Sequence, residues 1–130
     1  MSDEREIRSL IELWIEAVRA QDIDGVVAHH TDDIVMFDVP PPVEVRGIKA
    51  YRETWPPFFE WQKRASGTFE IAALDVAAGA EVAFATALLR CGSKDDLAKD
   101  PSPQLRLTIG LRKVAGRWAI AHEHHSFPAT

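Results

Sequence analysis

The amino-acid sequence predicts an α+β fold, a cone-shaped α+β barrel in which three N-terminal helices pack on a strongly curved antiparallel sheet. Two observations predict it. Apolar residues recur at helical spacing in the first half of the chain, and strand patterns separated by short turns follow in the second half. Helices that precede antiparallel strands cover one face of the sheet, and a curved sheet leaves a hollow beneath them.

Length and composition restrict the class of function. The chain has 130 residues, of which 46% are apolar and 27% charged, which is typical of one globular domain. A formal charge of −5 argues against a phosphate-binding surface, so no nucleic-acid partner is expected. No membrane span or export signal is recognised, which predicts a cytoplasmic protein without a membrane partner. Cys91 is the only cysteine, so no intrachain disulfide forms.

The first helix is predicted from Asp3 to Ala20, because its apolar residues share one side and its charged residues the other. The apolar residues at this spacing are Ile7, Leu10, Ile11, Trp14 and Val18. Asp22 is a favourable N-cap for a second, shorter helix that ends near His29. His29 and His30 are expected at its C-terminal end as solvated capping residues.

A third helix is predicted from Ile48 to about Trp61, and the prolines at positions 56 and 57 should kink or split it after Thr54. Aromatic residues crowd this segment, and at helical spacing such residues more often belong to a core than to a ligand cage. Four aromatic residues of the chain are candidates for both core and pocket wall. They are Trp14, Trp55, Phe58 and Trp118.

Five strands are predicted from runs of β-branched and alternating apolar residues. They are Asp33 to Asp38, Thr68 to Val76, Glu81 to Cys91, Gln104 to Val114 and Trp118 to Ser126. The first strand stops at Asp38 because Val39 and three prolines follow. Residues 92–103 are polar and contain prolines, which predicts an exposed connector, with a mobile lid as the alternative.

The last strand becomes rich in histidine towards its end. Strict alternation along it places four residues on one face, namely Trp118, Ile120, His122 and His124. Glu123 and His125 then take the opposite face, where His125 is interpreted as a structural, hydrogen-bonded histidine. We therefore expect a pocket with apolar walls into which His122 or His124 projects.

Asp38 is the candidate general base, because apolar neighbours at a strand end can desolvate a carboxylate, although an aspartate there can also simply cap a turn. His122 and His124 are candidate acids or bases. Arg106 and Thr108 share a face of the preceding strand. If that face is concave, Arg106 binds a carboxylate or enolate oxygen of the substrate, and if it is convex, Arg106 pairs with a surface acid or a dimer mate.

A metal site is a further alternative, because two same-face histidines and a carboxylate can form a facial ligand set. No additional histidine or glutamate at ligand spacing supports it. We therefore expect neither a metal nor another cofactor.

Several short patterns together resemble the SnoaL-like, ketosteroid-isomerase-like branch of the nuclear transport factor-like superfamily. These patterns are the first helix with Trp14, Asp22-x-Asp24, Asp32-Asp33-x-x-x-x-Asp38, Arg46-Gly47, and Gly116-x-Trp118-x-Ile120-x-His122-x-His124-x-Ser126-x-Pro128. The resemblance spans nearly the whole chain and implies one SnoaL-like domain over residues 1–130. It also implies a cone-shaped fold, frequent homodimers and a cavity that serves isomerases, cyclases, dehydratases, hydrolases or simple binding.

The resemblance places Asp38 where isomerase-like members carry the carboxylate that moves a proton. Those members also offer a tyrosine from the first helix and a second acid from a later strand. This chain has Trp14 in its first helix, and its only tyrosine, Tyr51, lies in the third helix. The departure argues against steroid isomerisation.

Two hypotheses follow from the sequence. In the first, the chain is a cofactor-free isomerase-, cyclase- or dehydratase-type enzyme that transfers protons on a small apolar or mixed-polarity molecule. In the second, it is a non-catalytic ligand-binding or dimerisation module. A homodimer is expected in both, because an apolar second sheet face is usually buried by a partner.

Overall fold

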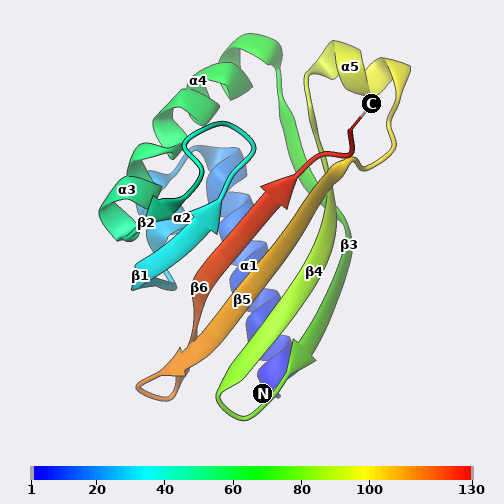
Figure 1. The fold of residues 1–130 in the computed structure, drawn as a ribbon. Coiled ribbons are helices and arrows are strands. Elements are labelled where there is room, and N and C mark those ends of the chain that lie inside the picture. Colours follow the sequence, from blue (N-terminus) through cyan, green and yellow to red (C-terminus); the bar gives the residue numbers. More distant parts are fainter. Residues whose placement is uncertain (1, 130) are drawn as a thin grey trace.

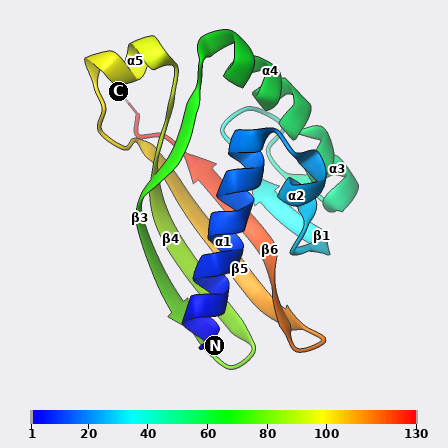
Figure 2. The same ribbon diagram turned by 180° about the vertical axis from the view of Figure 1, so that it is seen from behind.

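Helix α1, Asp3–Ala20, lies across the inner face of the sheet in the computed structural model, which describes residues 2–129 (Figure 2). The side chain of Ser2 caps its first turn by accepting from the backbone N–H of Arg5 at 3.2 Å. Gln21 ends the helix in the left-handed conformation, at φ 58°. The predicted apolar stripe is buried, so the predicted extent and orientation of this helix are confirmed.

The remaining N-terminal helices form one end of the molecule. Helix α2, Ile23–Val27, is capped by Asp22 as predicted, and it is shorter than expected. The third predicted helix is two helices, α3, Ile48–Glu53, and α4, Trp55–Ala65. The break after Thr54 is confirmed, because the two prolines occupy the first turn of α4, where a missing N–H costs nothing.

The sheet has six strands in the order β2-β1-β6-β5-β4-β3 (Figure 1). Their bounds are His30–Phe37 for β1, Val45–Arg46 for β2, Thr68–Ala78 for β3, Val82–Gly92 for β4, Leu105–Val114 for β5 and Arg117–Ser126 for β6. The strands β3 to β6 pair antiparallel, as predicted. The prediction of an entirely antiparallel sheet is wrong at one place, because β6 lies parallel to β1. Local turn signals do not determine a pairing between strands so far apart in sequence.

The segment predicted to be a loop at residues 92–103 contains a short helix, α5, Lys94–Lys99. Ser93 begins it by accepting from the backbone N–H of Asp96 at 3.0 Å. The helix projects beyond the sheet, next to the C-terminal end of the chain (Figure 1). The prediction of an irregular connector is therefore wrong in this detail, because a serine cap and an acidic first turn stabilise even a short helix.

A bulge at Ala121 reverses the facing of the end of β6. Ile120 pairs with Leu111 and His122 pairs with Gly110, so two steps along β6 match one step along β5. Gly110 accommodates the bulge, because a Cβ there would lie only 3.2 Å from the Cβ of His122. Beyond the bulge, the odd-numbered residues of β6 point inward and the even-numbered ones outward.

This bulge contradicts the predicted facing of the histidines. Trp118 and Ile120 are buried, but His124 is exposed, whereas Glu123 and His125 are buried. The prediction that His122 and His124 continue the apolar row is wrong, because strict alternation does not pass through a bulge.

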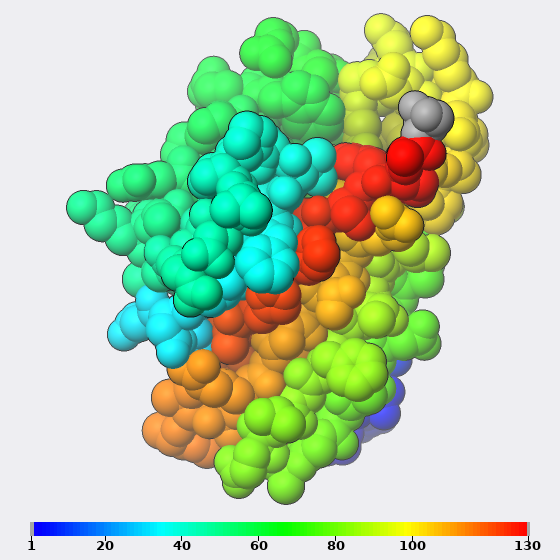
Figure 3. Space-filling model, in the orientation of Figure 1, coloured from blue at the N-terminus to red at the C-terminus, as the bar shows by residue number. Residues whose placement is uncertain are grey.

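The outer face of the sheet carries no helix among the described residues (Figure 3). Large apolar side chains lie exposed on it, including Phe84 at 55%, Leu88 at 41% and Phe37 at 37% exposure. None of the helices within residues 2–129 has the length and apolar character needed to cross a membrane.

Candidate functional site

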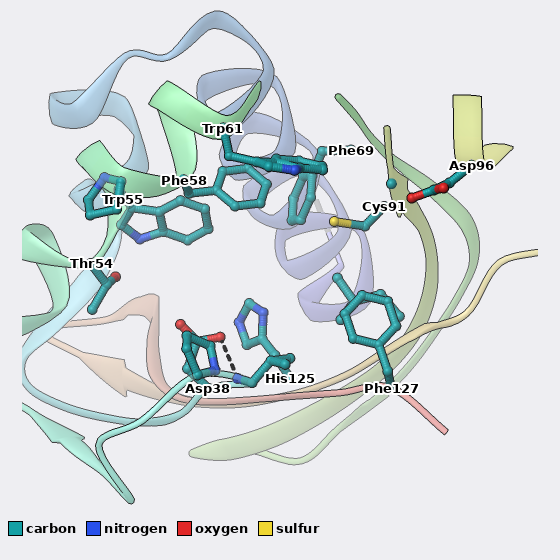
Figure 4. A pocket seen from close by; sticks show the side chains of 15 residues that line it. Asp38, Thr54, Trp55, Phe58, Trp61, Phe69, Cys91, Asp96, His125 and Phe127 are labelled. Atoms are coloured by element: carbon teal, nitrogen blue, oxygen red, sulfur yellow. Dashed lines mark hydrogen bonds between the residues drawn. The ribbon is translucent and has the colours of Figure 1, made fainter. Parts of the chain in front are cut away.

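A cavity of about 660 Å³ opens at the wide end of the cone, beneath α4 and beside α5 (Figure 4). Its walls are mainly aromatic, with rings contributed by Trp55, Phe58, Trp61, Phe69 and Phe127. The predicted pocket residues Trp55 and Phe58 therefore do line a cavity. A large hollow with oily walls and a few polar groups is the usual form of a small-molecule site.

The indole of Trp61 forms part of the wall opposite the sheet strands. Its position requires a glycine at residue 67. A Cβ placed on Gly67 would lie 2.6 Å from the Trp61 ring, closer than real side-chain atoms approach. Because Gly67 has no side chain, the ring lies directly against the chain that leads into β3.

Asp38 reaches the cavity because it continues the inward row of β1. Ile34 and Met36 are buried on that face, and Asp38 follows at the next alternate position, half-buried and lining the cavity. Its Oδ1 accepts a hydrogen bond from the backbone N–H of Val39 at 2.8 Å. This single local bond leaves the rest of the carboxylate directed at the cavity, as Figure 4 shows.

His125 is the second polar group in the wall, and it is only 6% exposed. Its Nε2 lies 2.8 Å from Oε1 of Glu123. Nδ1 has no hydrogen-bond partner within residues 2–129, and the ring lies in the cavity wall (Figure 4). The predicted hydrogen bond of His125 is confirmed, but its predicted facing away from the pocket is wrong because the bulge turns it inward.

Behind His125 lies a fully buried polar cluster centred on Glu123. Oε2 of Glu123 lies 2.6 Å from Nε2 of His30 and accepts a hydrogen bond from the Tyr51 hydroxyl at 2.7 Å. The indole N–H of Trp14 in turn donates to the Tyr51 oxygen at 3.0 Å. The Tyr51 hydroxyl therefore accepts from one side and donates to the carboxylate, so that the direction of this chain of hydrogen bonds is fixed.

The hydrogen-bond partners indicate which nitrogens of His30 and His125 carry protons. Nδ1 of His30 lies 3.1 Å from the carbonyl oxygen of Ala28, which can only accept, so this nitrogen carries a proton. With Glu123 ionised, Nε2 of His30 also carries a proton, and His30 is an imidazolium that balances the carboxylate. Nε2 of His125 donates to the ionised Glu123, so Nδ1 is the ring nitrogen that meets the cavity.

The pKa values of Glu123 and Tyr51 reflect the same contacts. Burial alone would raise the pKa of Glu123, but the hydrogen bonds and charges of His125 and His30 outweigh burial and lower that pKa to about 2. Burial and the adjacent Glu123 carboxylate raise the pKa of Tyr51 well above its usual value. Tyr51 therefore stays protonated and acts as a donor.

The electric field of Asp38 extends into the cavity. Burial raises the pKa of the Cys91 thiol, and the negative charge of Asp38 raises it further, to about 11. Both residues line the same cavity. Cys91 is thus a neutral thiol in the wall and not a nucleophile.

Several predicted site residues lie outside the cavity. Arg106 and Thr108 are exposed on the outer face of β5, so the concave alternative is wrong. Arg106 donates there to the Ser126 hydroxyl at 3.2 Å and not to an acid. His122, also on the outer side, lies 2.6 Å from the carbonyl oxygen of Val35 through its Nδ1. His124 borders a separate, open depression on the outside, which Asp38 also touches.

Two predicted tryptophans are core residues. Trp14 is 2% exposed and packs edge-on against Trp55 and His125, one layer behind the cavity wall. Trp118 lies at the opposite end of the cone, where its indole N–H donates to Asp3 at 3.0 Å.

The sequence reasoning missed Glu123, Tyr51 and His30 as members of the site. His30 is not a solvated cap, since its side chain is 0% exposed. Two signals could have revealed the arrangement. A glutamate inside an apolar strand needs buried partners, and the lone Gly110 within the neighbouring strand is typical of a bulge.

Metal binding finds no support in this geometry. Within residues 2–129 no group of three or more histidine, cysteine, aspartate or glutamate side chains is arranged to hold a metal ion. The nitrogen and oxygen atoms around Glu123 already bond to each other.

Comparison with known proteins places the chain in a family. A model of the SnoaL-like domain matches residues 7–130. The chain belongs to the SnoaL-like family. Among curated proteins, none matches this SnoaL-like chain.

Solved structures agree with this membership. An NTF2-like protein of unknown function from Pseudomonas putida KT2440 is 38% identical, with a TM-score of 0.85, and the match covers 100% of this SnoaL-like chain and 91% of that one. An NTF2-like protein with a cystatin-like fold from Novosphingobium aromaticivorans is 15% identical, with a TM-score of 0.77 and coverage of 96% and 81%. A protein from Parabacteroides distasonis ATCC 8503, provisionally named a ketosteroid isomerase, is 20% identical, with a TM-score of 0.69 and coverage of 94% and 85%.

Proposed function

We propose that this SnoaL-like protein is a cofactor-free proton-transfer enzyme that acts on a small, largely apolar molecule bound in the cavity. His125 is the general base, Glu123 holds its ring in the reactive tautomer, and Asp38 is the second acid or base. The observation that carries the proposal is the pairing of His125 with the buried, ionised Glu123, which leaves the free ring nitrogen at the cavity.

The proposed step is a proton shift next to a carbonyl group. Nδ1 of His125 takes a proton from the carbon beside the carbonyl, the electron pair moves to the oxygen as an enolate forms, and the proton returns to another position. The developing imidazolium is stabilised by the Glu123 carboxylate at 2.8 Å. Asp38 supplies or removes a proton on the other side of the substrate. The isomerase name of a neighbour with this fold is compatible with such chemistry and does not by itself establish it.

Hydrogen–deuterium exchange tests the proposal without knowledge of the natural substrate. The protein is incubated in D₂O with a panel of aryl alkyl ketones, some of which carry an amino group, and deuterium uptake beside the carbonyl is followed by NMR. We expect uptake above the buffer rate with the natural protein. His125→Gln should lower the uptake at least about tenfold, because proton transfer by a positioned group contributes roughly 100-fold or more.

His124→Gln is the matched control, because it removes the same ring from the outer face of the same strand. It should exchange at the natural rate. Equal exchange by the two glutamine variants, or no exchange of any ketone that binds, would refute catalysis and leave the non-catalytic ligand-binding module as the function.

We also propose that the outer face of the sheet binds a second copy of this chain. Three strands present large exposed apolar side chains there, and α1 to α4 cover only the inner side (Figures 1 and 2). Phe37 makes edge contacts with His122 and His124, with ring centres 5.0 and 5.4 Å apart, so this part of the face is already ordered for contact. A sheet face that pairs with itself gives a closed, two-fold dimer.

Analytical ultracentrifugation tests the dimer. The natural chain should sediment as a dimer, and Phe84→Glu should sediment as a monomer, because a charge replaces a large exposed apolar ring of the outer face. Glu12→Lys, on the exposed side of α1, should remain dimeric. A natural chain that stays monomeric at concentrations up to about 100 μM would contradict the proposal.

A further inference from the structure

The charged groups in the cavity wall all have the same sign. Asp38 and Asp96 contribute carboxylates, and no lysine or arginine belongs to the lining within the described residues. His125 is a neutral imidazole in the proposed function, where it acts as the base. Arg106, which follows the lining residue Leu105, is bound on the outer face to Ser126 and to the carbonyl oxygen of Phe127 at 3.3 Å.

The remaining wall is built from the faces and edges of aromatic rings. Trp55, Phe58 and Phe69 contact one another with ring centres between 5.4 and 6.3 Å apart, and Trp61 lies beside Phe58 at 5.3 Å. Aromatic faces carry partial negative charge, so they attract cations, and this attraction grows when water is excluded. Aromatic rings combined with carboxylates are the surroundings that bind ammonium groups.

Ligands of different charge meet different costs in this cavity. A neutral apolar molecule would cover the free side of the Asp38 carboxylate and leave it without a partner. An anionic molecule would be repelled by both carboxylates, and the charge of Asp38 already raises the pKa of Cys91. A cationic group compensates the carboxylate and contacts the rings at the same time.

From these contacts we infer that the natural ligand carries a protonated amine, or another cationic group, on an apolar body, with the cation near Asp38 and the body among the rings. The inference rests on the proposed function in that the cavity is taken as the ligand site. It adds the chemical class of the ligand. Asp96 attracts the same group at the rim, since it is exposed and lies on α5 at the entrance (Figure 4).

Three probes with the same body and different head groups test the inference: 4-phenylbutylamine, 4-phenylbutan-1-ol and 4-phenylbutanoate. Binding of each to the full chain at pH 7 is measured by isothermal titration calorimetry and located by NMR shifts of the tryptophan indoles. We expect the amine to bind at least about tenfold more tightly than the alcohol, and the carboxylate to bind most weakly.

Substitutions assign the preference to its residues. Asp38→Asn should lower the ratio of amine to alcohol affinity at least about fivefold, and Asp96→Asn should lower it by a smaller factor. Asp95→Asn removes the same charge from a neighbouring exposed position of α5 that does not line the cavity, so it should leave the ratio unchanged. Circular dichroism confirms that each variant is folded.

The outcomes separate the inference from the proposed function. If the alcohol or the carboxylate binds in the cavity as tightly as the amine, the cationic class is wrong while the cavity remains a ligand site. If Asp38→Asn and Asp95→Asn change the ratio equally, the preference reflects net charge and the inference also fails. If none of the probes binds, both the inference and the cavity-based function fall.

Discussion

The inner and outer sides of β6 carry the same residue type in opposite surroundings. His125 on the inner side is buried, its Nε2 is bound to Glu123, and its other nitrogen meets a cavity. His124 on the outer side is exposed, packs edge-on against Phe37 and borders an open depression. The two residues are adjacent and therefore face opposite sides, and the bulge at Ala121 decides which of them points inward. Composition identifies a histidine-rich strand, but the local backbone decides which ring has the surroundings needed for chemistry.

The largest expected effect is a loss of stability when the buried carboxylate on the inner side is replaced. Glu123→Gln removes the charge that holds His30 and His125, and it leaves a buried imidazolium without its partner. Breaking one side of a buried ion pair costs about 3–5 kcal/mol. Urea unfolding should show a loss of this size, whereas Glu12→Gln, on the exposed side of α1, should change the free energy of unfolding by less than about 0.5 kcal/mol.

The next effect is a smaller loss of stability as the pH falls, which comes from the protonation of Glu123. The pKa of Glu123 is lowered from 4.5 to about 2 in the folded chain, so the unfolded chain binds more protons between these values. The corresponding stability is complete above pH 4.5 and is lost as the pH falls towards 2, by about 3 kcal/mol at most. Glu123→Gln should lack this part of the pH dependence. An unchanged acid transition in the variant would mean that the buried carboxylate is not ionised.

The next largest effect is a several-fold change in the rate at which Cys91 is alkylated inside the cavity. Burial and the charge of Asp38 raise the pKa of this thiol to about 11. Asp38→Asn removes the second cause, so iodoacetamide at pH 8.5 should alkylate the variant about two to five times faster. Asp95→Asn should react at the natural rate. Equal rates in all three proteins would show that Asp38 has no electrostatic influence inside the cavity.

The smallest effect is expected for the outer face. Thr108→Ala changes a side chain that points away from the cavity. It should leave the affinity for 4-phenylbutylamine within about twofold of the natural value, as calorimetry can determine. A larger loss would break the comparison, because it would show that the two sides of the sheet are coupled.

The sequence predicted the elements better than it predicted the site. Helix α1 follows from its apolar stripe and its cap, and the break at Thr54 follows from the geometry of proline, because both depend on neighbouring residues alone. Asp38 could be placed for a similar reason, since alternation runs undisturbed along β1 from Ile34. Its catalytic role, like that of His122 and His124, stays a prediction.

The polar cluster could not be assembled in the same way. Glu123 bonds to His30, 93 positions earlier, and to Tyr51, 72 positions earlier. These contacts depend on the parallel pairing of β1 with β6, which no turn signal encodes. Whether His125 points inward depends on Ala121, the extra residue of the bulge. The sequence feature that marks this bulge is Gly110 in the neighbouring strand.

The contact between Trp61 and Gly67 separates control of ligand size from control of proton chemistry. Any side chain at position 67 would push the Trp61 indole away from the backbone that precedes β3, since even a methyl group would lie 2.6 Å from the ring. Because the other side of that ring bounds the cavity, its displacement changes the room available to a guest molecule. Selection acting on this one backbone position can therefore retune which molecules are admitted, while every proton donor and acceptor keeps its place.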